Sequence, residues 1–298
     1  CVGSRVAKGI PHDMRTVPIG RAQVSRVCIG GNPFSGFSHQ GKARNEERKA
    51  YYTPQRIHDA LREAEANGIN TFLGRTDDHI FGILRDYRAA GGTIQWFAQV
   101  GVEGDAEDGT WRKWLKGAIE LGAAGAYIHG GVVDYWHANG LFDLFEEALG
   151  IMREGGVAAG FAGHRPQAHE WIRDHLDTDF QMCSYYNPTD RTRHAQHISV
   201  GEKWHEADRA AMLKVIETID RPVVHYKVFG GGNRPVEEAM RVMGRAMRPG
   251  DITCLGVFLK EDPDMIAQDV ALFEDHVERR GGATAHAEAD ALDASNPG

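Results

Sequence analysis

The chain has 298 residues, of which 42% are hydrophobic and 26% are charged, and its formal net charge is −8. This composition is typical of a globular protein with a large core. The acidic balance, without a lysine or arginine run, argues against a nucleic-acid partner, and no apolar run approaches the roughly 18 residues of a membrane span.

Short apolar segments alternate with amphipathic helical patterns along the chain. The expected strands are rich in β-branched and aromatic residues and are bounded by Gly, Pro, Asn or Asp. They cover residues 24–31, 69–74, 93–102, 124–131, 157–164, 179–187, 222–230 and 252–259. Helical patterns cover residues 53–68, 110–122, 141–156, 206–219, 235–247 and 263–280.

Eight strand segments that alternate with helices predict βαβ units and a parallel sheet. Eight such units close into a single (β/α)8 TIM barrel, an α/β fold, and no GxGxxG motif follows the first strand to favour an open, doubly wound sheet. Residues 14–23 predict a short N-terminal β-hairpin across the bottom of the barrel. We therefore expect an N-terminal extension at 1–13, the barrel at 14–280 and a flexible tail at 281–298.

The cysteines bear on the cellular compartment. Cys28, Cys183 and Cys254 lie in strand segments, so we expect buried free thiols and not a disulfide framework. Cys1 permits two interpretations. It would be the processed N-terminus of an exported lipoprotein, or an arbitrary first residue of a protein with a default cytoplasmic location.

In a TIM barrel the chemistry lies at the C-terminal ends of the strands. There His129 and Asp78 predict an acid/base pair, because a carboxylate raises the pKa of a nearby imidazole towards neutral pH. Arg75 and Lys227 would hold a carboxylate or stabilise an oxyanion, and Gln99 would orient hydroxyl groups. The candidates for substrate binding are Asn32, Tyr186 and Asn187.

The same strand ends also permit a divalent metal such as Zn, Mn or Fe, which binds mixed carboxylate and imidazole ligands. The candidate ligands are Asp78, His129, His164 and His225. However, the strand alternation that points Tyr226 into the barrel points His225 away from it. The metal is therefore optional in the predicted chemistry.

Several segments resemble the aldo-keto reductase superfamily. The segments "MRTVPIGRAQVSRVCIGGNPFSG" and "ALREAEANGINTF" are similar to the opening hairpin and first strand, and to the first helix and second strand, of that family. The segments "DFQMCSYYNPTDR" and "PDMIAQDVALF" are similar to its sixth strand and its last helix. The resemblance covers residues 14–278 and implies the barrel fold of the family.

The catalytic tetrad of that family is Asp, Tyr, Lys and His. Only the histidine is retained, as His129, while Leu73, Asp78 and Gln99 stand at the other three positions. A tyrosine acid needs its ammonium neighbour to lower its pKa. The resemblance therefore implies a scaffold without the usual carbonyl reduction, unless a tyrosine and a lysine reach His129 from another loop.

The resemblance also implies the nicotinamide cofactor NADP. Tyr226 matches the aromatic residue that stacks on the nicotinamide, and Gly230, Gly231 and Asn233 in the turn after the seventh strand would carry the cofactor. The positions that grip its 2′-phosphate hold apolar residues in this sequence. Few contacts to NADP are therefore retained.

Taken together, these features predict an enzyme that performs acid/base chemistry, of lyase, isomerase or hydrolase type, on a small polar carbonyl or carbohydrate compound. Two alternatives stay open. The first is an NAD(P)-dependent oxidoreductase of the aldo-keto reductase superfamily, and the second is a non-catalytic barrel that binds a small-molecule ligand.

Overall fold

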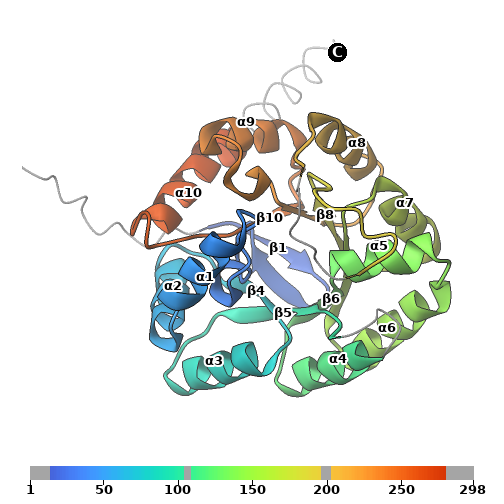
Figure 1. The fold of residues 1–298 in the computed structure, drawn as a ribbon, viewed down its shortest axis with the longest axis horizontal. Coiled ribbons are helices and arrows are strands. Elements are labelled where there is room, and N and C mark those ends of the chain that lie inside the picture. Colours follow the sequence, from blue (N-terminus) through green and yellow to red (C-terminus); the bar gives the residue numbers. More distant parts are fainter. Residues whose placement is uncertain (1–13, 104–108, 196–202, 280–298) are drawn as a thin grey trace, which may run out of the picture.

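The computed structural model describes residues 14–103, 109–195 and 203–279. Eight strands form a closed parallel barrel in the order β10-β3-β4-β5-β6-β7-β8-β9, and helices surround it (Figure 1). The prediction of a single (β/α)8 barrel with an N-terminal hairpin is confirmed. The calls on the extension at 1–13, on Cys1 and on the tail from 281 concern residues outside the described ranges.

The strands are β1 (Thr16–Ile19), β2 (Ala22–Ser25), β3 (Val27–Gly30), β4 (Thr71–Arg75), β5 (Gln95–Val100), β6 (Gly125–Ile128), β7 (Ala158–Gly163), β8 (Phe180–Ser184), β9 (Val223–Tyr226) and β10 (Ile252–Leu255). The α-helices are α1 (Lys42–Tyr51), α2 (Pro54–Ala66), α3 (Asp78–Ala89), α4 (Thr110–Glu120), α5 (Gly130–Ala138), α6 (Phe142–Glu154), α7 (Pro166–His175), α8 (Glu206–Ile216), α9 (Val236–Ala246) and α10 (Met265–Phe273). Short helices of other types are η1 (Pro33–Ser35), η2 (Gly230–Gly232) and η3 (Glu274–Glu278).

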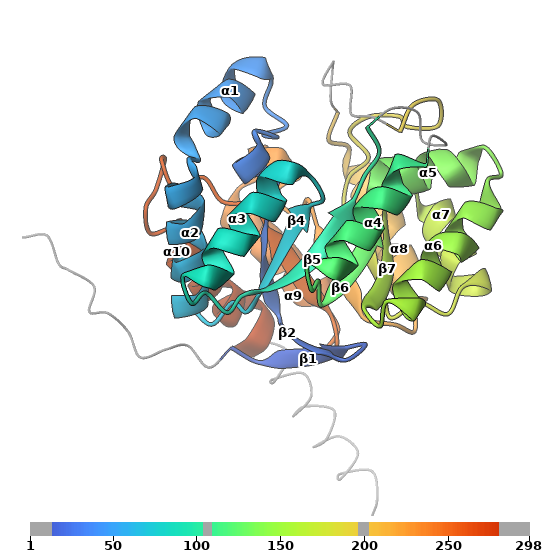
Figure 2. The same cartoon turned by 90° about the horizontal axis from the view of Figure 1, so that it is seen from below.

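The hairpin β1–β2 closes the bottom of the barrel, at the end opposite to α1 (Figure 2). Val17, Ile19 and Val24 of the hairpin pack into the barrel interior. The first predicted strand, 24–31, is therefore divided, because its first two residues belong to β2. The chain turns from the hairpin into the barrel between Ser25 and Val27. The Ser25 N–H donates to Asn70 Oδ1 at 2.8 Å at this turn.

Hydrophobic side chains fill both sides of the sheet. Phe97, Tyr127 and Phe180 pack inside the barrel, while large side chains such as Trp96 and Trp136 pack between the strands and the helices. Because the interior is filled and the hairpin covers the bottom, the space for a ligand lies at the mouth, above the C-terminal ends of the strands.

Two helices begin directly at residues of the mouth. Asp77 is the N-cap of α3, and its Oδ1 accepts from the Ile80 N–H at 2.8 Å. His129 is the N-cap of α5, and its Nδ1 accepts from the Gly131 N–H at 3.2 Å. Each cap satisfies a backbone donor at the helix start and fixes a polar side chain at the mouth.

Helix α1 stands at the mouth end of the barrel (Figure 2). Arg44 of α1 forms an ion pair with Glu261, and Lys260 Nζ lies 2.7 Å from Glu47 Oε1, so two pairs join α1 to the loop before α10. In the described part of the chain, no helix has the length and apolar composition needed to cross a membrane.

Candidate active site

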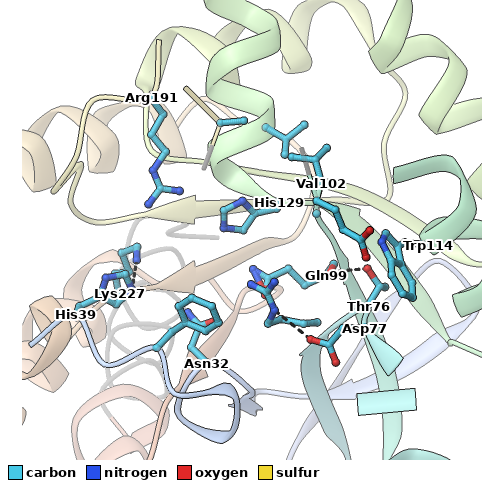
Figure 3. Close-up of a pocket in the computed structure, with 16 residues that line it drawn as sticks. Asn32, His39, Thr76, Asp77, Gln99, Val102, Trp114, His129, Arg191 and Lys227 are labelled. Atoms are coloured by element: carbon cyan, nitrogen blue, oxygen red, sulfur yellow. Dashed lines mark hydrogen bonds and ion pairs between the residues drawn. The ribbon is translucent and has the colours of Figure 1, made fainter. Parts of the chain in front are cut away.

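Two adjoining cavities open at the mouth. The first, the mouth cavity, has a volume of about 360 Å³ and lies above β4, β5 and β6 (Figure 3). The second, the side cavity, has a volume of about 430 Å³ and extends from the barrel interior to α10. Both are lined by Asn32, Phe37, His39, Gln99, His129 and Lys227.

The structure brings most of the predicted catalytic side chains together with one predicted substrate-binding residue, Asn32. Asn32, Arg75, Gln99, His129 and Lys227 all line the mouth cavity, as the rule about strand ends predicts. Their roles stay predictions, but their common location makes the mouth cavity the candidate active site.

Asp78 is not among them, and its predicted position is wrong. It is exposed in the first turn of α3, because Asp77 takes the capping position and turns the chain into a helix. Asp77 instead lines the mouth cavity, where its Oδ2 lies 3.3 Å from Arg75 Nε. The carboxylate at this edge of the cavity is therefore Asp77.

His129 is a neutral hydrogen-bond donor and not the cationic partner of a carboxylate. Burial, followed by the positive charge of Arg191, lowers its pKa well below the ordinary value, and Arg75 and Lys227 act in the same direction. Because Nδ1 accepts from the Gly131 N–H, the ring proton lies on Nε2. This corrects the expectation that a nearby carboxylate raises the pKa of His129.

Lys227 and His39 form a bridge across the mouth. Lys227 Nζ donates to His39 Nε2 at 2.7 Å (Figure 3). Among the described residues, these are the two non-glycine residues with positive φ, 54° for Lys227 and 59° for His39. Such conformations cost on the order of 1 kcal/mol or more each and cluster at functional sites.

Arg191 was not predicted as a site residue. It is buried in the loop after β8, and its guanidinium lies on the side of the cavity that also holds Lys227 and His39, across from Asp77 (Figure 3). The sequence singles out Arg191 only through the Asp-Arg pair in "NPTDR". That pair contributes to the family resemblance and implies no role for Arg191. The cavity thus has a cationic side and an acidic side.

A hydrogen-bonded chain of three residues ends at the side cavity. His164 Nδ1 lies 2.8 Å from Asp134 Oδ2, and His164 Nε2 lies 3.3 Å from the hydroxyl of Tyr226, which also lies 3.2 Å from the Gly163 carbonyl. The ring N–H donates to the carboxylate, so Nε2 is the acceptor that faces the phenol. Tyr226 and His164 line the cavity next to His129.

Burial determines the protonation states of Asp134, His164 and Tyr226. Burial raises the pKa of Asp134 to about 6, against the hydrogen bonds that its carboxylate accepts from the N–H groups of His164 and Arg165. Burial and the charge of Arg191 lower the pKa of His164 well below its ordinary value, while burial and the charge of Asp134 raise that of Tyr226. At neutral pH the chain therefore consists of a carboxylate, a neutral imidazole and a protonated phenol.

A second hydrogen-bonded group of a tyrosine, a histidine and an aspartate lies away from both cavities. Tyr185 Oη lies 3.0 Å from His225 Nδ1, and His225 Nε2 lies 3.3 Å from Asp251 Oδ2. All three residues are fully buried, and none lines a cavity at the mouth. His225 points out of the barrel because it neighbours Tyr226, which points in.

The four predicted metal ligands are therefore not brought together. Asp78 is exposed, His164 bonds to Asp134, and His225 bonds to Asp251 behind the sheet. Within the described ranges, no group of three or more His, Cys, Asp or Glu side chains is arranged to hold a metal ion. The predicted ligand set is wrong because two of its members lie outside the mouth.

Two predicted substrate-binding residues also lie elsewhere. Tyr186 is fully buried, and its hydroxyl accepts from Arg209 at 3.1 Å and from Arg234 at 3.3 Å. The Asn187 N–H donates to Asp208 at 3.3 Å, and neither residue lines the cavities. The strand ends at Ser184, so these residues belong to the following loop, where they bond to the first turn of α8.

The glycine turn after β9 has little capacity to bind a phosphate. Gly230, Gly231 and Gly232 all have positive φ. The N–H groups of Gly230, Gly232, Asn233 and Arg234 donate to carbonyls of Lys227, Phe229 or Gly230. A phosphate cradle needs free N–H groups, and this turn uses most of its own internally.

The family resemblance would imply the usual carbonyl reduction if a tyrosine and a lysine lay beside His129. Tyr226 and Lys227 do line the side cavity with His129. However, the phenol faces His164, and Lys227 Nζ lies 5.9 Å from the centroid of the tyrosine ring and bonds to His39. A proton donor is thus present, but not in the phenol–ammonium pair of the reductases.

No family model matches the sequence, and no curated protein does. Among solved structures, the chain is similar to a provisionally assigned aldo-keto reductase from Pseudomonas aeruginosa, with a TM-score of 0.57, 17% identity, and coverage of 90% of this chain and 99% of that one. It is also similar to the aldo-keto reductase AKR11C1 from Bacillus halodurans, with a TM-score of 0.54, 15% identity, and coverage of 90% and 96%.

At these identities the likeness concerns the fold alone. The chain is a divergent (β/α)8 barrel similar in architecture to the aldo-keto reductases, and these structural neighbours are enzymes. The residues that surround its cavities form a different arrangement of polar groups.

Proposed function

We propose that this protein is an acid/base enzyme, of isomerase or lyase type, that moves a proton next to the carbonyl of a small anionic carbonyl or carbohydrate compound. The observation that carries the proposal is the chain Asp134–His164–Tyr226, which ends at a cavity beside the neutral His129. The fold and its enzymatic neighbours are consistent with catalysis at the mouth.

Each residue has a separate part in the proposed step. His129 donates its Nε2–H to the substrate carbonyl oxygen and stabilises the charge that develops there. The oxygen of Tyr226 takes a proton from the neighbouring carbon while its own proton passes to His164 Nε2. Asp134 stabilises the imidazolium that forms, and the reverse movement returns the proton to the substrate.

The charge of the cavity indicates the class of substrate. Arg191 and Lys227 lie on the side of the mouth cavity across from Asp77, and both lower the pKa of His129, which indicates a positive field on that side. A carboxylate or phosphate on the substrate is attracted to this side, while Gln99 and Asn32 can hold hydroxyl groups.

The test is a screen by proton NMR in buffered D2O. The protein is incubated with sugar acids, sugar phosphates and 2-oxo acids, and the spectra report both new product signals and loss of the C–H signal next to the carbonyl. We expect turnover of at least one anionic compound, and a loss of rate of roughly 100-fold or more in Tyr226→Phe, which is the lower end of the range for general acid/base groups.

The matched control is Tyr185→Phe, which removes a phenol from the second hydrogen-bonded group, Tyr185–His225–Asp251, and leaves the cavities unchanged. It should retain the wild-type rate at a temperature where both variants are folded. Equal rates in both variants would refute the role of Tyr226. If turnover requires added NADPH, the protein is instead an oxidoreductase, and if every compound only binds, it is a ligand-binding barrel.

A further inference from the structure

A buried carboxylate without a partner faces the side cavity. Asp269 on α10 is 6% exposed and lines the cavity. In the part of the chain that the structure describes, it takes part in no hydrogen bond or ion pair, and the charge that affects it most is that of another carboxylate, Asp262. Buried polar groups are normally paired, so an unpaired carboxylate in a cavity wall is positioned to accept a hydrogen bond from a ligand.

The surroundings of Asp269 are apolar or acidic. Phe258, Met265 and Leu272 line the same end of the cavity. Asp262 lines it as well, and its carboxylate accepts from the side chain of Gln268 at 3.0 Å. This end therefore combines apolar surface with hydrogen-bond acceptors.

The nearby cations are directed to other partners. Arg234 NH2 lies 2.6 Å from Glu206 Oε1. Arg48 donates to Gln40 at 3.3 Å, and its guanidinium lies 5.0 Å from the centroid of the Phe258 ring. Lys260, near the position where a reductase grips the 2′-phosphate, pairs with Glu47 at 2.7 Å.

These residues do not fit the phosphates of NADP. The glycine turn uses most of its N–H groups internally, Arg234 and Lys260 are ion-paired, and two carboxylates face the cavity next to α10. Placing phosphate against Asp262 and Asp269 would bring like charges together in a partly buried site. The cofactor of the resembling family is therefore a poor occupant of this cavity.

We infer that the α10 end of the side cavity binds a neutral or cationic molecule with an apolar body, whose hydroxyl or amine group donates a hydrogen bond to Asp269. Such a ligand buries its body against Phe258, Met265 and Leu272 and supplies the donor that the carboxylate lacks. The site is independent of the proton transfer proposed for Tyr226, and either can fail without the other.

The inference is tested with three probes that share a body and differ in their head group, 2-phenylethylamine, 2-phenylethanol and phenylacetate. The methyl group of Met265 lies at the site and reports binding by NMR in protein labelled with ¹³C-methyl methionine, and Met265→Leu assigns its signal among the eight methionines. At pH 8 the amine should bind tightest and the alcohol next. The carboxylate should bind about tenfold or more weakly than the amine.

Asp269→Asn keeps the shape and removes the charge. It should abolish the preference for the amine over the alcohol, while Asp264→Asn, which removes an exposed carboxylate outside the cavity, should preserve it. The inference is overturned if phenylacetate binds as well as the amine, if Asp269→Asn leaves the preference unchanged, or if NADPH shifts the Met265 signal at lower concentration than all three probes.

Discussion

Replacing Asp269 with asparagine measures what an unpaired buried carboxylate costs this fold. Burial, and then the charge of Asp262, raises the pKa of Asp269 from 3.8 to about 7. At 1.36 kcal/mol per pKa unit, this difference corresponds to roughly 4 kcal/mol. The folded protein therefore binds the Asp269 proton more tightly than the unfolded chain does.

The sign of the effect follows from this linkage. A carboxylate with a raised pKa in the folded state makes the free energy of unfolding fall as the pH rises from about 4 to about 7, and the loss is complete above that range. Asparagine has no charge to bury, so Asp269→Asn should be more stable than the wild type at pH 8, by up to roughly 4 kcal/mol, and nearly equal to it at pH 4.

Urea unfolding at pH 5, 6, 7 and 8 provides the assay, with the difference between the two proteins taken at each pH. Taking differences removes the contribution of the other charged groups at this cavity, which include Glu261, Asp262, Arg48 and Arg234. An unchanged m-value would show that the same surface unfolds. If the difference between wild type and variant stays constant across this range, Asp269 is not a buried, unpaired carboxylate.

Three further outcomes are expected. Asp251→Ala should destabilise the fold by about 3–5 kcal/mol in urea unfolding, because it leaves buried donors unpaired. Burial alone would raise the pKa of Asp251, but hydrogen bonds from its neighbours hold it well below its usual range, so the wild type should lose this stability as the pH falls below about 4. Gly131→Ala should cost about 1–3 kcal/mol in thermal unfolding, since the added Cβ would collide with the Ala195 carbonyl and the side chain of Arg191. In ¹⁵N NMR, His129 should carry its proton on Nε2 and should not titrate between about pH 6 and 8. Arg191→Leu removes a positive charge near His129 and should therefore raise the pKa of His129.

The strands were predictable because each is a short, continuous apolar run that the barrel buries on both faces. Their ends were less predictable. The segment 124–131 was expected to be strand throughout, but β6 ends at Ile128 and α5 begins at Gly130. Two glycines at a helix start are poor helix formers, and here the cap by His129 and the burial of Trp136 outweigh that local preference.

The site was predictable where it depends on strand ends and not where it depends on helices and loops. Gln99 and His129 could be placed by counting to the end of a strand. Asp134 could not, because it lies one turn into α5 and reaches His164 only through the packing of that helix on β7. Arg191 comes from a loop that packs closely against Gly131, and no sequence pattern encodes that contact.

The burial of Asp134, His164 and Tyr226 also indicates the kind of reaction that these three residues favour. The side chain of His164 is 2% exposed and that of Asp134 is 0% exposed, so Tyr226 is the most accessible of the three residues at the side cavity, which His164 also lines. A reductase consumes a proton in each turnover and must replace it from solvent. A closed chain instead favours a reaction that returns the proton it has taken, as in an isomerisation. The product formed in D2O should therefore retain much of the original hydrogen, and complete exchange with solvent in every turnover would show that the chain is open.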